Sequence, residues 1–135
     1  METVASVAHR QLADTGQVLG RHVLCEFWEC NQDVLNSRRV LVTALRRAVK
    51  AAGGTLLGIK SHAFKPHGVS AVALLGESHM SIHTWPELGY AAVDVFTCGA
   101  SMDPHRAVEL LSRVLRAAKA VIREVPRGPG VGQDG

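Results

Sequence analysis

The sequence predicts an α+β fold in which an antiparallel β-sheet is covered on one face by two helices, giving a two-layer sandwich. Segments with strand-like patterns follow one another through short turns, and two further segments place apolar residues at helical spacing. The 135 residues, 47% of them hydrophobic, suffice for one core but not for two ordinary domains. We therefore expect one globular domain over residues 20–126, preceded by a flexible arm at 1–19 and followed by a flexible tail at 127–135.

Charge and cysteine content narrow the environment in which the protein works. The formal net charge is +3 and the basic residues are dispersed without interleaved aromatics, so we expect no nucleic-acid partner. The three cysteines, Cys25, Cys30 and Cys98, form neither a CxxC pair nor an even disulfide set, which is typical of a reducing compartment. No apolar run approaches membrane length, and Met1 to Gly20 carries charges where a signal peptide needs an apolar core. We expect a cytoplasmic protein with no membrane partner.

The first half of the domain reads as strand, helix and strand. Residues 21–28 alternate, with Val23, Cys25 and Phe27 on one side, and predict a strand. Asn36 or Ser37 can cap a helix that ends at Gly53-Gly54. The apolar stripe of this helix consists of Leu41, Leu45, Val49 and Ala52.

The second half begins with several strands joined by short turns. Residues 55–64 predict a strand, and Lys65 to Gly68 has the composition of a turn. Residues 69–75 are rich in valine, leucine and alanine and predict a largely buried strand. The next strand, 79–85, alternates, with Met80 and Ile82 on one face and His79, Ser81 and His83 on the other. After a turn at 86–89, residues 90–98 predict one more strand.

A second helix and a last strand complete the expected domain. Asp103 caps this helix and Pro104 occupies its first position. Its buried stripe consists of Ala107, Leu111, Val114, Leu115 and Ala118. Residues 121–125 predict the final strand.

Polar residues interrupt the strand-like sequence between Gly76 and Cys98, and they suggest chemistry. A shared metal ion is not expected, because four residues of strand separate His79 from His83 by ~13 Å. A serine hydrolase is also a poor match, since Ser78 lacks the G-x-S-x-G elbow. Taken one at a time, these residues are equally well explained as hydrogen-bonded sheet histidines, a buried cysteine and strand-end serines.

Taken together, they resemble one family. The stretch contains Glu77-Ser78-His79, then Ile82 to Glu87, then Gly89 to Gly99. With these motifs the chain resembles, over most of its length, the short bacterial and archaeal S-adenosylmethionine decarboxylase proenzymes. These are pyruvoyl-dependent lyases that supply the aminopropyl donor for spermidine, a polyamine.

The resemblance implies a self-processing zymogen. Autocatalytic cleavage between Glu77 and Ser78 would convert Ser78 into a pyruvoyl group, which serves as the cofactor and forms a Schiff base with the substrate's amine. His83 matches the base that removes the α-proton during processing, and Ser70 matches a serine that assists the acyl shift. Cys98 matches the residue that donates a proton to the substrate carbon.

The resemblance also implies how substrate is bound. Phe64 matches an aromatic that stacks on adenine, and Glu87 matches a carboxylate that binds the ribose hydroxyls. This chain departs from the family pattern at Lys65 and His67. These residues place a cation and a titratable ring beside the expected pocket. Pyruvoyl-dependent decarboxylation of arginine or ornithine therefore stays open as an alternative, as does an unprocessed relative that regulates an active partner chain.

Two expectations concern geometry. Along a regular strand Ser78 and His83 lie ~16 Å apart and on opposite faces, so either the chain bends near Glu77 to His79 or the two residues meet in another way. Two helices cover only one face of the sheet, so the other face must be buried elsewhere. We expect a homodimer of cleaved protomers, with the sheets face to face as a four-layer αββα sandwich or edge to edge.

Overall fold

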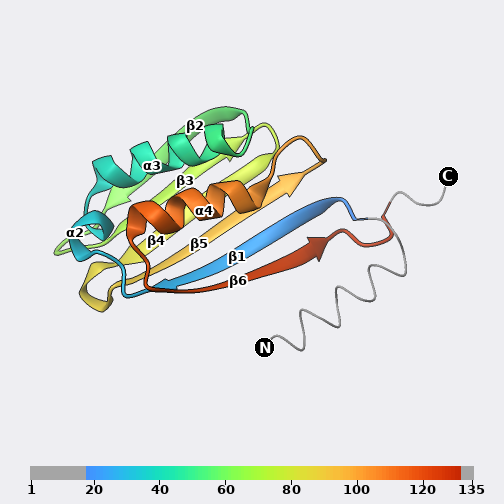
Figure 1. Ribbon diagram of the computed structural model, residues 1–135. Helices are drawn as coiled ribbons and strands as arrows, with labels where there is room; N and C mark the ends of the chain where they lie inside the picture. Colours follow the sequence, from blue (N-terminus) through green and yellow to red (C-terminus); the bar gives the residue numbers. More distant parts are fainter. Residues whose placement is uncertain (1–17, 132–135) are drawn as a thin grey trace.

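The computed structural model describes residues 18–131 and has the expected α+β architecture (Figure 1). Six antiparallel strands form one sheet in the order β2-β3-β4-β5-β1-β6. Most of the arm expected at 1–19 and part of the tail expected at 127–135 lie outside the described residues. The elements are β1 (Gly20–Trp28), α2 (Gln32–Leu35), α3 (Arg38–Ala51), β2 (Leu56–Ala63), β3 (Val69–Leu75), β4 (Ser78–Trp85), η1 (Pro86–Leu88), β5 (Tyr90–Cys98), α4 (Pro104–Leu115) and β6 (Lys119–Arg127).

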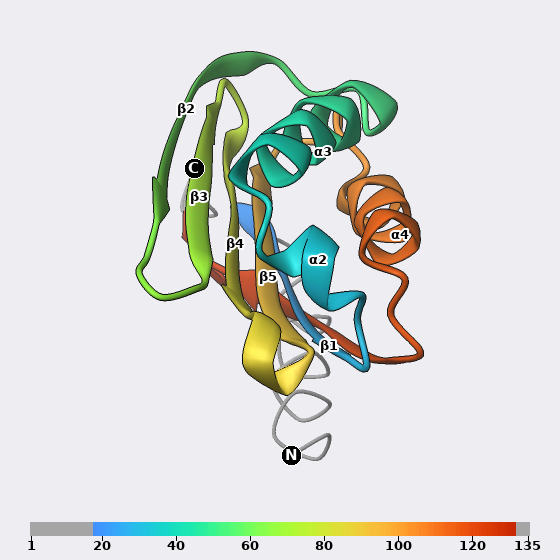
Figure 2. The ribbon, with the colours of Figure 1, turned by 90° about the vertical axis from the view of Figure 1, so that its left-hand side faces the viewer.

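Both long helices lie on the same face of the sheet (Figure 2). Side chains cap them as expected: Ser37 accepts from the backbone N–H of Val40 at the start of α3, and Asp103 accepts from that of His105 at the start of α4. We call the face of the sheet under α3 and α4 the inner face, and the opposite face the outer face. Among the described helices, none is both long and apolar enough to span a bilayer.

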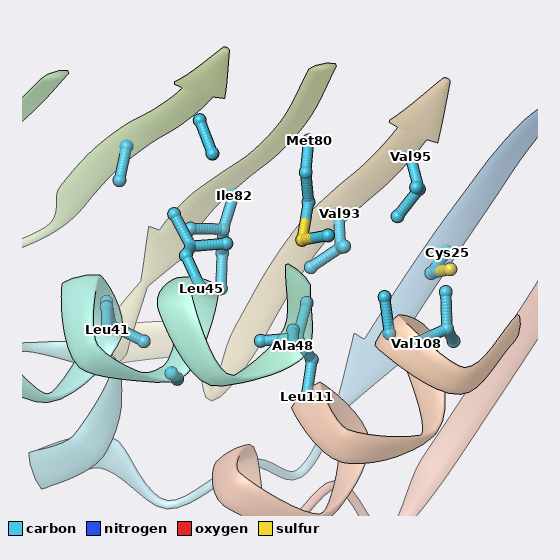
Figure 3. Packing of buried hydrophobic residues seen from close by; sticks show 14 of the residues in the cluster. Cys25, Leu41, Leu45, Ala48, Met80, Ile82, Val93, Val95, Val108 and Leu111 are labelled. Carbon is cyan, nitrogen blue, oxygen red and sulfur yellow. The ribbon is translucent and has the colours of Figure 1, made fainter. Parts of the chain in front are cut away.

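The hydrophobic core lies between the inner face and the two helices (Figure 3). Leu45 of α3 and Leu111 of α4 are almost completely buried and face Met80, Ile82 and other strand residues in this view. The alternation predicted for β4 is confirmed, because Met80 and Ile82 are buried in this core while His79, Ser81 and His83 are only partly buried. Close packing of this kind fixes the strand positions to which the outer-face side chains are attached.

The structure corrects several sequence-based expectations. β3 is buried on its inner face only: Val69, Ala71, Ala73 and Leu75 are buried, but Val72 and Leu74 on the outer face are 42% and 57% exposed. The reason is that helices cover only one face of the strand. Ala118 is exposed and lies beyond the end of α4, so it does not belong to the helical stripe. The last strand is longer than predicted, since β6 pairs with β1 along the whole of β1.

Candidate active site

The predicted site residues fall into two groups at opposite ends of the β3–β4 hairpin. The turn group, Glu77, Ser78 and Cys98, lies where β3 turns into β4 and where β5 ends. The pocket group consists of Phe64, Ser70, His83 and Glu87 and lies at the other end of these strands. The structure therefore brings the predicted residues together within each group but not into a single site.

The pocket group lines a cavity of about 410 Å³. Ser70 and His83 are direct partners across β3 and β4, and Ser70 Oγ lies 2.8 Å from His83 Nδ1. Glu87 Oε1 lies 3.1 Å from His67 Nε2. His67, where this chain departs from the family pattern, is therefore a hydrogen-bonding partner of Glu87. Lys65 is exposed and is not among the residues that line this cavity.

The loop between β2 and β3 shapes the wall of the cavity. Phe64 is 50% exposed, and its ring meets that of His62 edge to face at 4.6 Å. Gly68 adopts a positive φ of 104°, which glycine tolerates, and its N–H donates to Asn36 Oδ1 at 3.0 Å. Asn36 is the residue at which α2 ends, and α2 was not predicted because a four-residue helix shows no periodicity. The residue that ends this short helix therefore helps to fix Gly68, which lines the cavity.

The turn group centres on a non-glycine residue with an unusual backbone. Ser78 has a φ of 149°, a region that L-residues rarely adopt. The carbonyl oxygen of Glu77, just before it, accepts a hydrogen bond of 2.9 Å from the backbone N–H of Cys98. The Cys98 side chain is exposed, whereas Cys25 and Cys30 are buried. Burial raises the pKa of the Cys25 thiol to about 12 and that of Cys30 to about 11, so these two cysteines are core residues.

The Glu77 side chain is fixed by Thr55, the residue that directly precedes β2. Its carboxylate accepts from the backbone N–H of Thr55 at 2.9 Å and from Thr55 Oγ1 at 3.2 Å. The backbone hydrogen bond from Thr55 lowers the pKa of Glu77. The cleavage bond predicted from the sequence therefore follows an ionised and anchored side chain.

Within one chain the two groups stay apart. β4 runs as one strand from Ser78 to Trp85, and the turn of the hairpin precedes Ser78. Because β4 is one continuous strand, residues five apart in it are separated by ~16 Å, and His83 does not reach Ser78 of the same chain. The pairing of β4 with β3 runs from Ser78 to His83 without a break, so the estimate for a regular strand applies and β4 does not contain the expected bend.

A further cluster of polar residues lies on the outer face near the turn group. Asp94 on β5 accepts hydrogen bonds from His22 Nε2 at 2.6 Å, from His79 Nε2 at 3.1 Å and from the hydroxyl of Ser81. Arg127 lies 2.9 Å from His22 Nδ1. Burial opposes ionisation of Asp94, but the hydrogen bonds from Ser81, His22 and His79 outweigh it and lower its pKa. We call these five residues the Asp94 cluster.

The Asp94 cluster contains three potential metal ligands, on His22, His79 and Asp94, within 4.8 Å of one another. A guanidinium can only donate, so the contact with Arg127 makes Nδ1 of His22 an acceptor and leaves the ring proton on Nε2. That proton is donated to Asp94. The three groups are thus already paired with one another as a hydrogen-bonded network. Sequence reasoning missed this cluster, although an isolated acid in the middle of the apolar strand β5 was a signal for it.

The fold and these groups define a class of protein: an α+β sandwich enzyme with a serine in a strained turn, an exposed thiol beside it and a separate pocket with a serine–histidine pair. The model of one family, S-adenosylmethionine decarboxylase, matches residues 21–128. The chain belongs to this family, as its motifs indicated.

Curated relatives and a solved structure agree with this assignment. The chain is 46% identical over 110 residues to the S-adenosylmethionine decarboxylase proenzyme of Methanococcus maripaludis strain C7, covering 82% of this chain and 90% of the relative. It is 44% identical to the proenzyme of that name from Thermotoga maritima, covering 82% and 85%. A crystal structure of the adenosylmethionine decarboxylase from Aquifex aeolicus superposes with a TM-score of 0.81 at 34% identity, covering 88% of this chain and 98% of that one.

Proposed function

We propose that this chain is a self-processing S-adenosylmethionine decarboxylase for spermidine biosynthesis, with a pyruvoyl group made from Ser78 as its cofactor. The observation that carries the proposal is the geometry of the turn, where Ser78 at a φ of 149° follows a carbonyl held by the N–H of Cys98. A serine hydroxyl, a neighbouring carbonyl and a donor to that carbonyl are what an acyl shift needs. Once formed, the pyruvoyl group supplies a ketone that condenses with the substrate's amine and accepts the electrons released with carbon dioxide.

The proposed cleavage uses side chains and backbone groups of this protein, with water as the only further reactant. Ser78 Oγ attacks the carbonyl carbon of Glu77, the bond from that carbon to the nitrogen of Ser78 breaks, and the chain is joined by an ester. The hydroxyl proton passes to the released amine. A base then removes the α-proton of Ser78 and the ester bond to Cβ breaks, which releases the carboxylate of Glu77 and leaves a dehydroalanine. This group tautomerises to an imine, and water adds to the imine carbon and expels ammonia to leave the ketone. The N–H of Cys98 supports the first step because it already points at the oxygen on which negative charge develops.

The base for elimination is His83, and we propose that it comes from a second copy of the chain. Ser78 and His83 of one chain are ~16 Å apart, so one chain cannot complete the site. A two-fold axis through the middle of the outer face would bring the pocket group of each copy to the turn group of the other. The partly exposed apolar side chains of the outer face support burial against a partner, as at Leu24, Val72 and Leu74.

Each group then has a separate task in the completed site. His83, paired with Ser70 at 2.8 Å, acts in processing. Cys98, exposed beside Ser78, gives the proton to the substrate carbon after carbon dioxide leaves. Phe64 and Glu87 line the pocket, which is of ligand size, and bind the adenine and ribose of the substrate.

S-adenosylmethionine is the substrate that the pocket and the family support over arginine or ornithine. A half-exposed aromatic ring at Phe64 suits an adenine, and neither alternative amino acid carries one. Lys65, which raised the question of substrate identity, is not among the residues lining the cavity. We place the homodimer in the cytoplasm, in keeping with three free cysteines.

The proposal is tested on the purified full chain by intact mass and by release of labelled carbon dioxide. Mass measurement should find a fragment of residues 1–77 and a fragment of residues 78–135 that begins with pyruvate. Carboxyl-labelled S-adenosylmethionine should release label, while arginine and ornithine should not. Ser78→Ala should remain one chain, and Ser112→Ala, on α4, should be cut like the wild type. A wild-type chain that stays uncut after prolonged incubation overturns the mechanism, and label released only from arginine or ornithine overturns the substrate.

A further inference from the structure

The strained residue beside the β3–β4 turn is Ser78, the first residue of β4, and not Gly76 in the turn itself. Tight hairpin turns usually place glycine wherever φ is positive, because glycine has no Cβ to clash. Here Gly76 is not among the glycines with positive φ, and Ser78, with a φ of 149°, takes the unfavourable conformation instead. Such a conformation persists only where the surrounding structure imposes it. The contacts on each side of Ser78 therefore need an explanation.

On the side of Glu77, the contacts come from Thr55. Its N–H and hydroxyl bind the two carboxylate oxygens of Glu77, at 2.9 and 3.2 Å. Its carbonyl oxygen accepts from the N–H of Gly76 at 2.9 Å. Thr55 directly precedes β2, which is paired with β3 along its length, so the anchor belongs to the sheet and not to the turn. Three hydrogen bonds thus fix the residues just before Ser78.

On the side of His79, the contacts come from the Asp94 cluster. Asp94 of β5 accepts from His79 at 3.1 Å and is itself held by His22 of β1 and by Ser81. Arg127 of β6 holds His22 in turn and lies over the ring of Phe96 at 5.4 Å. His79 is therefore attached to strands on the far side of β4 from Thr55. Glu77 and His79, which flank Ser78, are therefore held by contacts from opposite sides of β4 within the sheet.

We propose that Thr55 and Asp94 are positioning residues for self-cleavage, holding Glu77 and His79 so that Ser78 keeps a backbone conformation that the uncut chain disfavours and that cleavage releases. The inference rests on the proposed function. In the acyl shift the bond from the Glu77 carbonyl carbon to the Ser78 nitrogen breaks and the bond to Ser78 Oγ forms, with the hydroxyl proton moving to the nitrogen. The φ torsion of Ser78 includes the bond to the Glu77 carbonyl carbon, so the constraint ends when that bond breaks.

The strain is measured directly in two uncut variants, Ser78→Ala and Ser78→Gly. At an ordinary strand position glycine is less stable than alanine, because it loses more conformational freedom on folding. At position 78 glycine relieves the positive φ, so Ser78→Gly should melt higher than Ser78→Ala by about 3–8 °C. As a matched control, Ala92→Gly in the Ser78→Ala background should lower the melting temperature. If Ser78→Gly melts at or below Ser78→Ala, the inference is overturned.

The anchors are tested by the rate at which freshly made chain is cut. Thr55→Val removes the hydroxyl but keeps the N–H, and we expect cleavage to slow about threefold to tenfold, since a side-chain hydrogen bond to a charged group is lost. Asp94→Asn should slow it more, because it weakens the three hydrogen bonds that Asp94 accepts from His22, His79 and Ser81. Ser61→Ala, on β2, loses the hydrogen bond from Arg38 of α3 and should be cut at the wild-type rate.

A second readout separates positioning from general damage. Once Thr55→Val has been cut, its decarboxylation rate per pyruvoyl group should lie within twofold of wild type, because the constraint no longer exists. Cleavage of Thr55→Val at the wild-type rate, or an equal loss in both steps, contradicts the inference. If Asp94→Asn does not fold, Thr55→Val decides alone. If the wild type itself is never cut, the proposed function fails, while the comparison of Ser78→Gly with Ser78→Ala still measures the strain.

Discussion

The two faces of the sheet use the same strands for different purposes. On the inner face, side chains such as Met80 and Ile82 are completely buried against α3 and α4. On the outer face, the neighbours of these residues in β4 are His79, Ser81 and His83, which form specific polar contacts and stay partly exposed. Because side chains alternate along a strand, the packed inner face fixes the spacing of the polar groups opposite. Inner-face changes should thus alter stability, and outer-face changes should alter reaction rates.

The largest effect is expected at His83 on the outer face. His83→Ala removes the proposed base for elimination, and general bases contribute about 10²–10⁴-fold to a rate. We expect pyruvoyl formation to slow by that factor while the melting temperature stays close to that of wild type. Quantifying pyruvate on the 78–135 fragment over time measures the change. Processing at the wild-type rate would remove His83 from the mechanism.

The matching change on the inner face is Leu45→Ala. Leu45 is completely buried in α3, and replacing a buried leucine with alanine costs about 2–5 kcal/mol of stability. Urea denaturation measures that loss. The decarboxylation rate per folded site should stay within about twofold of wild type, and a larger loss would show that the two faces are not separable.

Cys98→Ala sharpens the comparison, since it separates a chemical cysteine from a structural one. The side chain is exposed, so its removal should cost little stability. If the thiol donates the proton to the substrate carbon, the rate per pyruvoyl group should fall more than tenfold while substrate still binds. Activity normalised to pyruvoyl content measures this. A normalised rate within about twofold of wild type corresponds to only ~0.4 kcal/mol in the barrier and would exclude the role.

A smaller effect is expected on the edge strand β6, where Glu124 accepts hydrogen bonds from Arg21 and from His105. The hydrogen bond from Arg21 is the main reason that the pKa of Glu124 falls from 4.5 to about 2. A lowered folded-state pKa stabilises the protein above pH 4.5, and this stabilisation is lost as the pH falls towards about 2. Glu124→Gln should lower stability by about 1 kcal/mol at pH 7, because the pair is partly exposed. Urea denaturation should find the difference shrinking below pH 4.5, and a pH-independent difference would contradict this account.

Much of the fold followed from local patterns. The caps at Ser37 and Asp103 and the alternation in β4 were readable because each depends on residues close in sequence. The exposure of Val72 on the outer face could not be predicted, since a run of apolar residues does not indicate whether one face of the strand or both faces are covered.

The site was less accessible to sequence reasoning, for reasons of long-range pairing. The Asp94 cluster joins β1, β4, β5 and β6, and β1 inserts between β5 and β6, which no local pattern predicts. The family motifs named Ser78 and His83 without indicating that one chain holds them at opposite ends of a strand. The positive φ of Ser78 is likewise imposed by contacts from Thr55, distant in sequence.

The central claim, that two copies complete each site, is tested most directly by mixing two inactive variants. Ser78→Ala retains its pocket group and His83→Ala retains its turn group, so a mixed dimer contains one site with Ser78, Cys98 and His83 all intact. Co-expressing the two chains with different tags and isolating the mixed dimer should give rapid cleavage of the His83→Ala chain and decarboxylation at about half the wild-type rate per dimer. A mixed dimer in which the His83→Ala chain is cut no faster than it is alone would contradict the account.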